Sequence, residues 1–320
     1  MSGGAKLAVT VAEVTPVNAL ITRFRFVARD GGPLPAFSGG AHVVVEMDDH
    51  GTRRLNPYSL MSDPEDRSGY SISVRRDEAG RGGSLYMHRH VRPGMGMVLS
   101  HPMNLFPLDM LARKHLMIAG GIGITPFLAQ IKQLSRLGGR FELHYATRNA
   151  GLCAYGAALK AAHGERVQMY FDDDGQVLPL KDLLGRQPLG THLYVCGPKG
   201  MLAWVRKSAE AAGWPSAAVH FEEFLAPGSG RVFTAQLATS GKTITVGTHQ
   251  SLLEAIEAAG VDAPYLCRGG ACGQCETNVL ACDGTLLHRD HWLSAEEQAA
   301  GQKIMPCVSR FEGTTLVLDR

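Results

Sequence analysis

Hydrophobic and polar positions follow a strand-like pattern over the first third of the chain. From Val9 to about Leu108, short apolar runs alternate with turns that are rich in Gly, Pro and Asp. The clearest runs cover residues 19–27, 42–47, 70–75 and 97–100. No convincing long helical period interrupts them, and this spacing of short strands predicts a small antiparallel β-barrel.

The period changes at Lys114, where a buried type of strand, residues 115–119, leads into a glycine-rich turn over 120–125. Pro126 suits the first helical position, and apolar residues then recur at helical spacing until a glycine stops the helix. Further strands are expected at 141–146, 167–171 and 192–196, the last followed by a helix over about 199–212. Strands that alternate with helices predict a parallel α/β sheet.

Small, turn-forming residues over 224–230 separate this region from a third pattern. Residues 232–237 and 242–246 flank a Ser-Gly turn and indicate a β-hairpin. Ser251, with Glu254 three residues later, forms the capping box of a helix. We therefore predict three domains: a β-barrel over 1–110, a parallel α/β domain over 111–225 and a compact mixed domain over 232–320, with 226–231 as the linker.

The composition narrows the class of protein. Of the 320 residues, 45% are hydrophobic and 19% charged, as in an ordinary soluble globular protein, and the net charge of +2 gives no argument for nucleic acid. Residues 1–14 lack the features of a signal peptide, and the longest apolar stretch, 116–129, is too short and too broken to span a bilayer. We therefore expect a soluble cytoplasmic protein with no membrane partner. Clustered cysteines there bind metal or carry out redox chemistry rather than form disulfides.

The clearest chemical signal is a constellation of four cysteines. Cys267, Cys272 and Cys275 have the spacing C-x4-C-x2-C, and Cys307 follows at a distance. This is the spacing of plant-type [2Fe-2S] proteins, in which four thiolates hold two irons. Glycines inside the loop let it fold closely and free its backbone N–H groups to donate to the sulfides.

Other interpretations of these cysteines fit the spacing less well. Structural zinc sites usually combine two short C-x2-C pairs, whereas here a triplet joins a single distant cysteine. A Rieske centre would need two histidines in place of two cysteines, and no C-x-H pair occurs. Cys153 and Cys282 lie outside the pattern, and we interpret them as packed thiols.

A second signal is the glycine-rich turn between the first strand and the first helix of the α/β domain. Gly120, Gly121 and Gly123 precede Thr125 and Pro126 at a junction where backbone N–H groups and the helix dipole face a bound pyrophosphate. The motif departs from the dinucleotide fingerprint G-x-G-x-x-G, because a proline stands where the third glycine would be. A purely structural glycine turn is the alternative.

Together these motifs resemble those of one enzyme family. The cysteine loop and the segments 288–290, 307–310 and 316–319 are similar to the ferredoxin domain of the phthalate dioxygenase reductase family. That family comprises class IA reductases of Rieske oxygenases, including vanillate O-demethylase reductases, and the resemblance extends over essentially the whole chain. It implies an antiparallel β-barrel flavin domain, an α/β parallel-sheet NAD domain and an α+β plant-type ferredoxin domain of the β-grasp fold.

The resemblance also implies a flavin site in the barrel. Residues 56–60 are similar to the family's R-x-Y-S-L motif and residues 81–84 to its phosphate-binding G-G-x-S region, although Ser84 directly follows the glycines. The family's arginine is Asn56 here, so Arg53 or Arg54 would compensate, unless the phosphate rests mainly on Ser84 and backbone amides. FMN is favoured over FAD by the resemblance alone. The expected flavin contacts are Arg54, Asn56, Tyr58, Ser59, Leu60, Ser73, Val74, Gly82, Gly83 and Ser84.

The nicotinamide site is expected at the ends of two strands of the α/β domain. Residues 196–198 resemble the family's C-G-P motif, and we assign Cys196 to positioning the nicotinamide rather than to covalent catalysis. Phe224 matches the aromatic that closes the NAD domain against the flavin in relatives, with a core phenylalanine as the alternative. An acidic turn from Asp172 would repel a 2′-phosphate and favours NADH over NADPH, unless it is simply a solvated turn.

The expected nucleotide contacts are Gly120, Gly121, Gly123, Thr125, Pro126, Thr147, Arg148, Asp172, Cys196, Gly197, Pro198 and Phe224. Catalytic roles are expected for Ser59, Cys196 and Phe224. NADH delivers two electrons as a hydride, whereas a [2Fe-2S] cluster accepts one, and a flavin between them can separate the pair. The sites therefore predict an NADH-dependent electron-transfer reductase.

As the resemblance implies, the acceptor is a Rieske-type terminal oxygenase that hydroxylates or demethylates a small organic substrate. It would dock transiently near the cluster loop, on a surface that includes Arg268 and Gln274. A reductase for another acceptor, such as a cytochrome P450, is one alternative, and a non-enzymatic metal- or nucleotide-binding protein is another. We expect a monomer.

Overall fold

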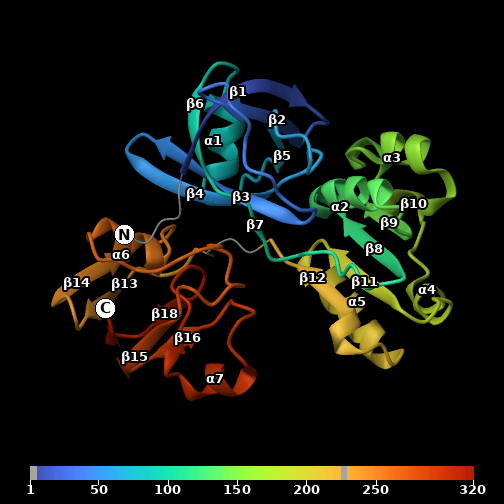
Figure 1. Ribbon diagram of the computed structural model, residues 1–320. Coiled ribbons are helices and arrows are strands. Elements are labelled where there is room, and N and C mark those ends of the chain that lie inside the picture. Colours follow the sequence, from blue (N-terminus) through green and yellow to red (C-terminus); the bar gives the residue numbers. More distant parts are fainter. Residues whose placement is uncertain (1–5, 225–228) are drawn as a thin grey trace.

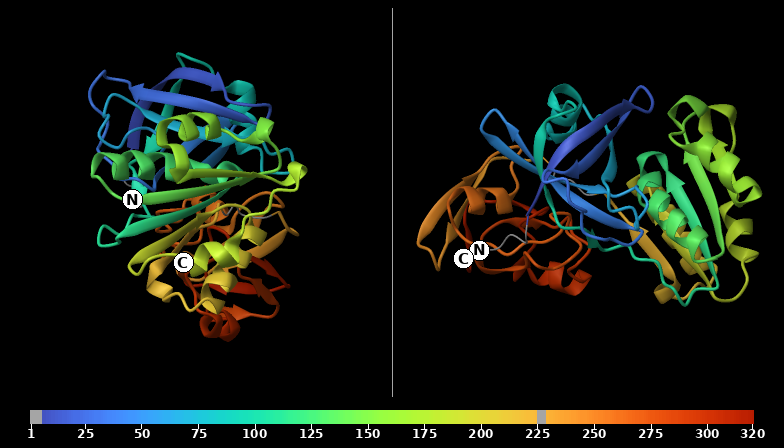
Figure 2. Two further views of the ribbon diagram at one scale, coloured as in Figure 1. Left: turned by 90° about the vertical axis from the view of Figure 1, so that its right-hand side faces the viewer. Right: turned by 45° about the horizontal axis from the view of Figure 1, so that its top comes forward.

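The computed structural model describes residues 6–224 and 229–320. These residues form three β-sheet domains in the order of the sequence (Figure 1). The N-terminal domain lies between the central domain on one side and the C-terminal domain on the other, as the right-hand view of Figure 2 shows. Residues 226–228 of the predicted linker lie outside the described residues.

The N-terminal domain is a barrel-like antiparallel sheet, as the strand pattern predicts. Its elements are β1 (Lys6–Pro16), β2 (Ile21–Ala28), β3 (Ala41–Asp49), β4 (Thr52–Ser59), β5 (Tyr70–Arg75), α1 (Gly83–His90), β6 (Gly96–Ser100) and β7 (Met103–Asn104). The strand order is β4-β3-β6-β1-β2-β5, and β7 pairs with β3. Alternate residues of β3, such as Val43 and Val45, enter the core, so the residues between them face outward.

The central domain is a parallel sheet with helices, also as predicted. Its strands are β8 (Lys114–Gly120), β9 (Phe141–Thr147), β10 (Val167–Phe171), β11 (Thr191–Cys196) and β12 (Val219–Glu222). Its α-helices are α2 (Thr125–Arg136), α3 (Gly156–His163), α4 (Leu180–Gly185) and α5 (Lys199–Ala211). Its short 3₁₀ helices are η1 (Gly121–Ile124), η2 (Ala150–Leu152), η3 (Gly164–Arg166), η4 (Asp172–Asp174) and η5 (Ser216–Ala218).

The strand order of this sheet positions a ligand site. The order is β10-β9-β8-β11-β12, so the direction of the connections reverses between β8 and β11. A crevice opens beyond the carboxyl ends of neighbouring strands at such a switch point. The glycine-rich turn follows β8, and Gly197 and Pro198 follow β11, so both predicted motifs lie at this crevice.

The C-terminal domain is a small sheet covered by short helices. Its elements are β13 (Phe233–Leu237), β14 (Lys242–Val246), α6 (Leu252–Ala258), β15 (Thr277–Cys282), β16 (Thr285–Leu287), α7 (Ala295–Ala300), β17 (Lys303–Ile304), β18 (Arg310–Glu312) and β19 (Leu316–Leu318). The main sheet has the order β14-β13-β19-β15-β17. The predicted hairpin is β13–β14, and Ser251 and Glu254 form the predicted capping box at the start of α6.

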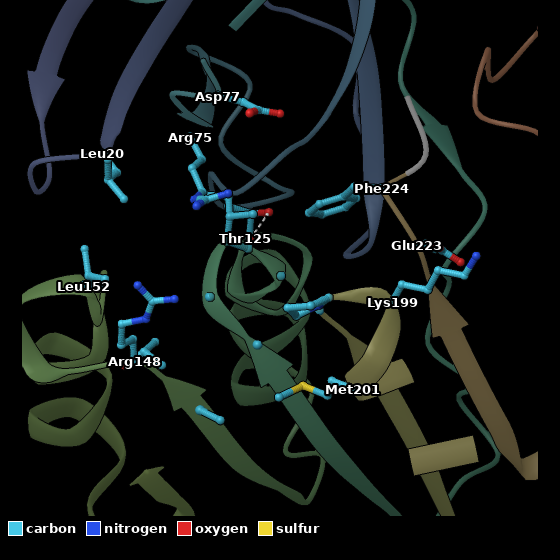
Figure 3. A pocket seen from close by; sticks show the side chains of 18 of the residues that line it. Leu20, Arg75, Asp77, Thr125, Arg148, Leu152, Lys199, Met201, Glu223 and Phe224 are labelled. Atoms are coloured by element: carbon cyan, nitrogen blue, oxygen red, sulfur yellow. Dashed lines mark hydrogen bonds between the residues drawn. The ribbon is translucent and has the colours of Figure 1, made fainter. Parts of the chain in front are cut away.

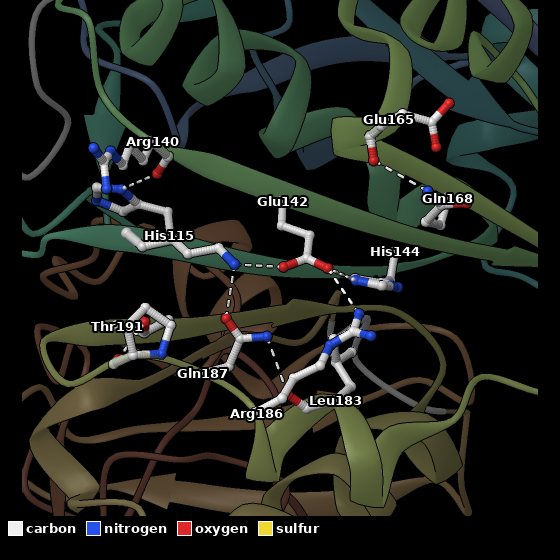
Figure 4. A network of polar contacts seen from close by, with 12 residues as sticks. His115, Arg140, Glu142, His144, Glu165, Gln168, Leu183, Arg186, Gln187 and Thr191 are labelled. Carbon is white, nitrogen blue, oxygen red and sulfur yellow. Dashed lines mark hydrogen bonds and ion pairs between the residues drawn. The ribbon is translucent and has the colours of Figure 1, made fainter.

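A polar network clamps the end of α4 onto the central sheet (Figure 4). Glu142 on β9 accepts from Lys114 Nζ at 2.5 Å, His144 Nε2 at 2.9 Å and Arg186 at 3.1 Å. Burial opposes ionisation of this carboxyl, but the bonds from Lys114 and His144 outweigh it and lower the pKa of Glu142 to about 2. Glu142 is therefore the negative centre of the network.

We expect Glu142→Ala to reduce the free energy of unfolding by about 3 kcal/mol, because three donors lose their common, partly buried acceptor. Glu165→Ala is the control, since the Glu165 side chain is 94% exposed and lies 3.7 Å from Lys160. Loss of such a surface pair changes stability by about 0.5 kcal/mol or less. Urea unfolding of both variants measures the difference, and equal destabilisation would contradict the network's role.

Contacts between the domains are direct. Lys132 Nζ on α2 donates to the carbonyl of Met61 at 3.0 Å and joins the central domain to the barrel. Arg81 of the barrel pairs with Glu254 on α6, and its Nε donates to the carbonyl of His249 at 2.7 Å. No helix within residues 6–224 and 229–320 combines the length and apolar content of a membrane span.

Candidate active site

A cleft of about 730 Å³ lies between the barrel and the central domain (Figure 3). It brings together many of the residues expected from the sequence. Those that line it are Tyr58, Ser59, Gly120, Gly121, Gly123, Thr125, Thr147, Arg148, Asp172, Gly197, Pro198 and Phe224. The predicted flavin and nucleotide motifs therefore face one shared space.

The glycine-rich turn and the end of β11 touch through their backbones. A Cβ on Gly123 would lie 2.2 Å from the carbonyl oxygen of Cys196, so a side chain has no room there. Thr125 Oγ1 donates to the carbonyl of Ile122 at 3.0 Å and closes the turn at the start of α2. An N-terminus of a 12-residue helix next to glycine backbone suits an anionic phosphate. Pro126 is buried in the first turn of α2 rather than lining the cleft.

Cys196 lies below the part of the cleft that Gly197 and Pro198 line. Its side chain is fully buried, and burial raises the pKa of the thiol well above its usual value. A protonated thiol is a poor nucleophile. This placement argues against covalent catalysis, while the positioning role of Cys196 stays a prediction.

Glu222 is a candidate site residue that the motifs did not reveal. It ends β12 and is the register partner of Cys196 on β11. Its Oε2 atom is buried without a hydrogen-bond partner among the described residues, although part of the residue remains accessible. Burial raises the pKa of Glu222 to about 8, so at neutral pH the carboxyl is protonated and is a donor without charge. In the sequence, the feature that points to Glu222 is its position two residues before Phe224.

The Glu222 carboxyl should give the protein a measurable pH dependence. The folded protein keeps this proton up to about pH 8, whereas an unperturbed carboxyl releases it near 4.5, so stability falls as pH rises through that window. The loss is at most about 5 kcal/mol above pH 8. Glu222→Gln should remove this slope in urea unfolding measured at several pH values; unchanged slopes in the variant would refute the assignment.

On the barrel side, Tyr58 and Ser59 reach the cleft from the end of β4. Asn56 Nδ2 lies 3.3 Å from the Tyr58 hydroxyl, and burial raises the pKa of that phenol. The side chains of Leu60 and Val74 instead belong to the barrel core. Ser73 Oγ lies 2.6 Å from the Tyr155 hydroxyl of the central domain and does not line the cleft.

Two polar side chains of β4 lie against the predicted phosphate loop, residues 81–84. A Cβ on Gly82 would lie 3.0 Å from Arg54 Cζ, and one on Gly83 would lie 2.5 Å from Asn56 Nδ2. Arg54 is held by Asp49 at 2.7 Å and also donates to the carbonyl of Arg81. Arg54 therefore brings a guanidinium group to this loop, where Asn56 has none. The hydroxyl of Ser84 accepts from the backbone N–H of Asp77 at 3.2 Å.

The four cysteines of the C-terminal domain converge. Cys267, Cys275 and Cys307 are buried and Cys272 is half-buried. Cys267 is hydrogen-bonded to Cys272, and Cys275 to Cys307. No three His, Cys, Asp or Glu side chains in the described part of the chain are set to hold a single metal ion.

Local donors favour the thiolate form in this loop. The bond from Cys272 and, after it, the backbone N–H groups of Ala271 and Gly269 lower the pKa of Cys267 to about 5. Gly270 and Gly273 have φ values of +73° and +76°, which allow the tight fold. Convergent thiols with free backbone donors fit an iron–sulfur cluster.

The cluster loop is linked to the cleft. Glu223, which lines the cleft beside Phe224, lies 2.7 Å from His291 Nε2 of the C-terminal domain. The backbone N–H of His291 donates to the carbonyl of Gly270 at 3.0 Å. The last residues of the central domain therefore contact both the cleft and the cysteine loop.

Arg268 does not belong to the exposed rim of this loop, and the prediction that it docks a partner is wrong. Its side chain is 4% exposed and pairs with Glu257, with Cζ 3.7 Å from the ring centre of Tyr265. Gln274 is exposed, as expected. Two large exposed side chains lie at the loop: Leu266, which is 42% exposed and directly precedes Cys267, and Trp292, which is 51% exposed and lies against Gly273.

Comparisons with known proteins agree with this arrangement. Residues 98–219 match the N-terminal domain of the "Dimethylamine monooxygenase subunit DmmA-like" model, and residues 236–312 match the 2Fe-2S iron-sulfur cluster binding domain. The chain is 45% identical to the heme-dependent oxidative N-demethylase beta subunit of Ectopseudomonas mendocina, covering 98% of both chains. It is 38% identical to a vanillate O-demethylase oxidoreductase of Pseudomonas sp. strain HR199, covering 93% of this chain and 95% of that one. A solved phthalate dioxygenase reductase structure superposes with a TM-score of 0.88 and 34% identity, covering 99% of this chain and 98% of that one.

Proposed function

Because the chain belongs to the phthalate dioxygenase reductase family of oxygenase reductases, we propose that it is the NADH-dependent reductase component of an oxygenase system. In this role it passes single electrons to a terminal oxygenase through a flavin and a [2Fe-2S] cluster. The predicted boundaries 1–110, 111–225 and 232–320 are part of this proposal as the flavin, NAD and ferredoxin domains.

The observation that carries the proposal is the shared cleft with its link to the cysteine loop. The nucleotide motifs and the flavin motif line the same space, and Glu223 at its edge reaches His291 beside the cluster loop. A bound flavin accepts two electrons from a nicotinamide and releases them one at a time. The chain's own residues hold the partners close: the glycine turn and Thr125 receive the pyrophosphate, Gly197 and Pro198 the nicotinamide, and Tyr58 and Ser59 the flavin ring.

Phe224 would control access to the flavin ring. Its side chain is 46% exposed and points into the cleft across from Thr125 (Figure 3). A nicotinamide that approaches the ring must displace this phenyl group, and the exposed ring has little packing to lose. We therefore assign Phe224 to closing the site between turnovers.

The flavin we propose is FMN. A second cavity, of about 570 Å³, lies between the barrel and α6 beside the phosphate loop, and Arg53, Arg54 and Arg81 line it. Three guanidinium groups suit the single phosphate of FMN. Glu254 and Glu257 of α6 line the same cavity and are paired with Arg81 and Arg268. They offer no positive charge to the second phosphate of FAD, which supports the smaller cofactor.

We propose NADH rather than NADPH as the donor. Thr147, Arg148 and Asp172 line the cleft at the carboxyl ends of β9 and β10. The following residues, Asp173 and Asp174, belong to the same turn η4, so Asp172 faces the cleft from an acidic turn. This charge would repel a 2′-phosphate.

Anaerobic titration of the purified holoprotein with NADH tests the function. We expect bleaching of both flavin and cluster absorbance, one equivalent of FMN on extraction, and iron and sulfide in a ratio that matches a [2Fe-2S] cluster. Titration with NADPH in parallel tests donor choice. A holoprotein whose flavin stays oxidised in excess NADH would refute the reductase assignment.

The resemblance to class IA reductases supports a Rieske-type oxygenase as the acceptor, docked transiently to a monomeric reductase. A haem-dependent oxygenase is the second candidate, because a relative at 45% identity is named as a subunit of a heme-dependent oxidative N-demethylase. Purified oxygenases of the two kinds, compared as electron acceptors at equal concentration, decide between them. The acceptor that reaches saturation at low concentration is the physiological type.

We propose that the oxygenase docks on the face around Trp292. The indole Nε1 donates to Glu276 at 3.0 Å, and Lys303 pairs with Glu276 and Glu297, so the exposed ring is held in place within a polar rim. Cys272, the least buried of the four cysteines, lies in the same loop as Gly273, which the ring covers. A fixed aromatic group beside the electron outlet has the character of a binding hot spot.

Trp292→Ala is therefore expected to raise the KM for the oxygenase by roughly 30-fold, as loss of about 2 kcal/mol of binding would do. The control is Trp204→Ala on α5 of the central domain. The Trp204 indole is 44% exposed, and the residue is more than 60 positions along the chain from the four clustered cysteines. Oxygenase-coupled turnover as a function of oxygenase concentration measures both. Similar KM values for the two variants would show that the oxygenase does not dock on the face around Trp292.

A further inference from the structure

The side chain of Arg81 joins the phosphate loop of the barrel to the C-terminal domain. Its Nε donates to the carbonyl of His249 at 2.7 Å, and its guanidinium group pairs with Glu254 on α6. The two side chains of this ion pair are mostly buried, with 17% and 15% of their surface exposed. Because little water competes for either group, such a pair holds its geometry better than a pair at the surface. Arg81 therefore fixes one domain against the other.

The backbone of Arg81 belongs to the phosphate loop itself. Its carbonyl accepts from Arg54, and Gly82 follows as the N-cap of α1 with a φ of +97°. This N-cap offers no side-chain acceptor to the first N–H groups of the helix. A phosphate is the acceptor that such a helix end suits. Any movement of Arg81 therefore moves the groups that would receive the flavin phosphate.

Glu254 connects this contact to the cysteines through α6. The backbone N–H of the preceding residue, Leu253, donates to the carbonyl of Pro306 at 2.9 Å. Pro306 directly precedes Cys307, the distant member of the four cysteines. The helix that receives Arg81 is therefore bonded to the segment that carries one of the expected cluster ligands.

His249, the other partner of Arg81, lies in a segment that a buried arginine holds in place. Arg310 donates to the carbonyl of Gln250 at 2.7 Å and to the carbonyl of Gly247 at 3.1 Å. These two carbonyls lie on either side of His249 in the sequence, so the segment shifts only if bonds to Arg310 break. The C-terminal domain therefore presents a rigid receiving surface, and the position of Arg81 depends on whether the two domains are docked.

We propose that Arg81 is a positioning residue that couples flavin binding to docking of the C-terminal domain. A docked domain holds Arg81 and orders the phosphate loop before the flavin arrives, so binding costs less conformational entropy. By linkage, a bound flavin favours the docked domain by the same factor. A chain that carries flavin therefore keeps its cluster domain against the barrel more of the time than a chain that has lost it. This inference rests on the proposed function, since it takes residues 81–84 as the phosphate site.

Glu254→Gln tests the coupling from the side of the C-terminal domain. Glutamine preserves the capping box of α6, because its N3 position accepts Glu or Gln, but it removes the charge that pairs with Arg81. If Glu254 acted on the flavin through its charge alone, the loss of that charge would favour a nearby phosphate and tighten FMN binding. Coupling predicts the opposite sign: we expect the Kd of the full chain for FMN to rise about tenfold.

Quenching of flavin fluorescence, with FMN titrated by the flavin-free full chain, measures this Kd. Glu297→Gln is the matched control, because Glu297 is the N3 residue of the capping box of α7 and pairs with Lys303 of its own domain. Its affinity for FMN should equal that of the wild type. A Kd of Glu254→Gln at or below the wild-type value would overturn the coupling. An equal rise in both variants would overturn it too, because the loss would then follow from either capping box.

Small-angle X-ray scattering of the full wild-type chain gives a second readout. The radius of gyration should be larger without FMN than with saturating FMN, because the C-terminal domain then leaves the barrel more often. Equal radii would overturn the coupling. Anaerobic mixing of the holoprotein with NADH distinguishes the two levels of failure. If the wild type reduces its flavin while Glu254→Gln binds FMN as the wild type does, the coupling is wrong and the reductase function stands. If the wild type does not reduce its flavin, the proposed function itself has failed.

Discussion

Cys307→Ser is expected to abolish electron output while leaving reduction of the flavin by NADH in place. Cys307 is the distant member of the four cysteines and is buried against Cys275. A [2Fe-2S] cluster needs four ligands, and a serine hydroxyl at this buried position is a poor substitute for a thiolate. Oxygenase-coupled turnover should fall by at least about 10²-fold, because the oxygenase loses its single-electron donor.

Iron and sulfide analysis and anaerobic NADH titration measure this prediction together. Cys307→Ser should contain little iron, yet its flavin should still bleach with NADH, since the cleft lies in the other two domains. Cys282→Ser is the matched control, because Cys282 lies outside the spacing pattern at the end of β15. It is exposed, so its interpretation as a packed thiol is wrong. Normal iron and sulfide content in Cys307→Ser would show that the ligand set is misassigned.

Most strands with a regular hydrophobic period are predicted, but not all, because β1 directs Val9 and Val11 into the core and no predicted run covers it. The alternating runs of the barrel and the buried strands of the central sheet are found within one or two residues of their predicted positions. β4 is not predicted from the sequence, because its arginines and Pro57 interrupt the alternation of apolar and polar residues. The proline is tolerated there since β4 is the edge strand of its sheet, where a missing N–H donor breaks no ladder bond.

At the site, the sequence predicts what a short local motif fixes and misses what depends on contacts between distant segments. The cysteine spacing, the glycine turn and the C-G-P motif are local, and each lies where its motif indicates. Glu222 and Arg268 carry charges that usually stay at the surface, so a sequence gives no reason to bury them. Glu222 is buried because β12 pairs with β11 in the register that sets it beside Cys196. Arg268 is buried because α6 supplies Glu257 as its partner.

Gly123→Ala is expected to disrupt NADH binding more than any other single methyl addition in the cleft. The new Cβ would lie 2.2 Å from the Cys196 carbonyl oxygen, 2.5 Å from its carbon and 2.8 Å from Gly197 N. All three are backbone atoms, so the clash is relieved only if the turn and the end of β11 separate. Since a shift of about 1 Å in a binding geometry can change rates by roughly 10²-fold, we expect the KM for NADH to rise by that order.

A glycine outside the cleft provides the matched control for this prediction. Gly138, which follows the end of α2, has a φ of +68°, and a Cβ there meets nothing within 4 Å. Gly138→Asn should therefore bind NADH nearly as well as the wild type, because asparagine tolerates the left-handed conformation. Stopped-flow flavin reduction at varied NADH measures both variants, and their flavin and iron content should match the wild type. If Gly123→Ala saturates at the same NADH concentration as Gly138→Asn, the close approach of the turn to β11 does not shape the nucleotide site.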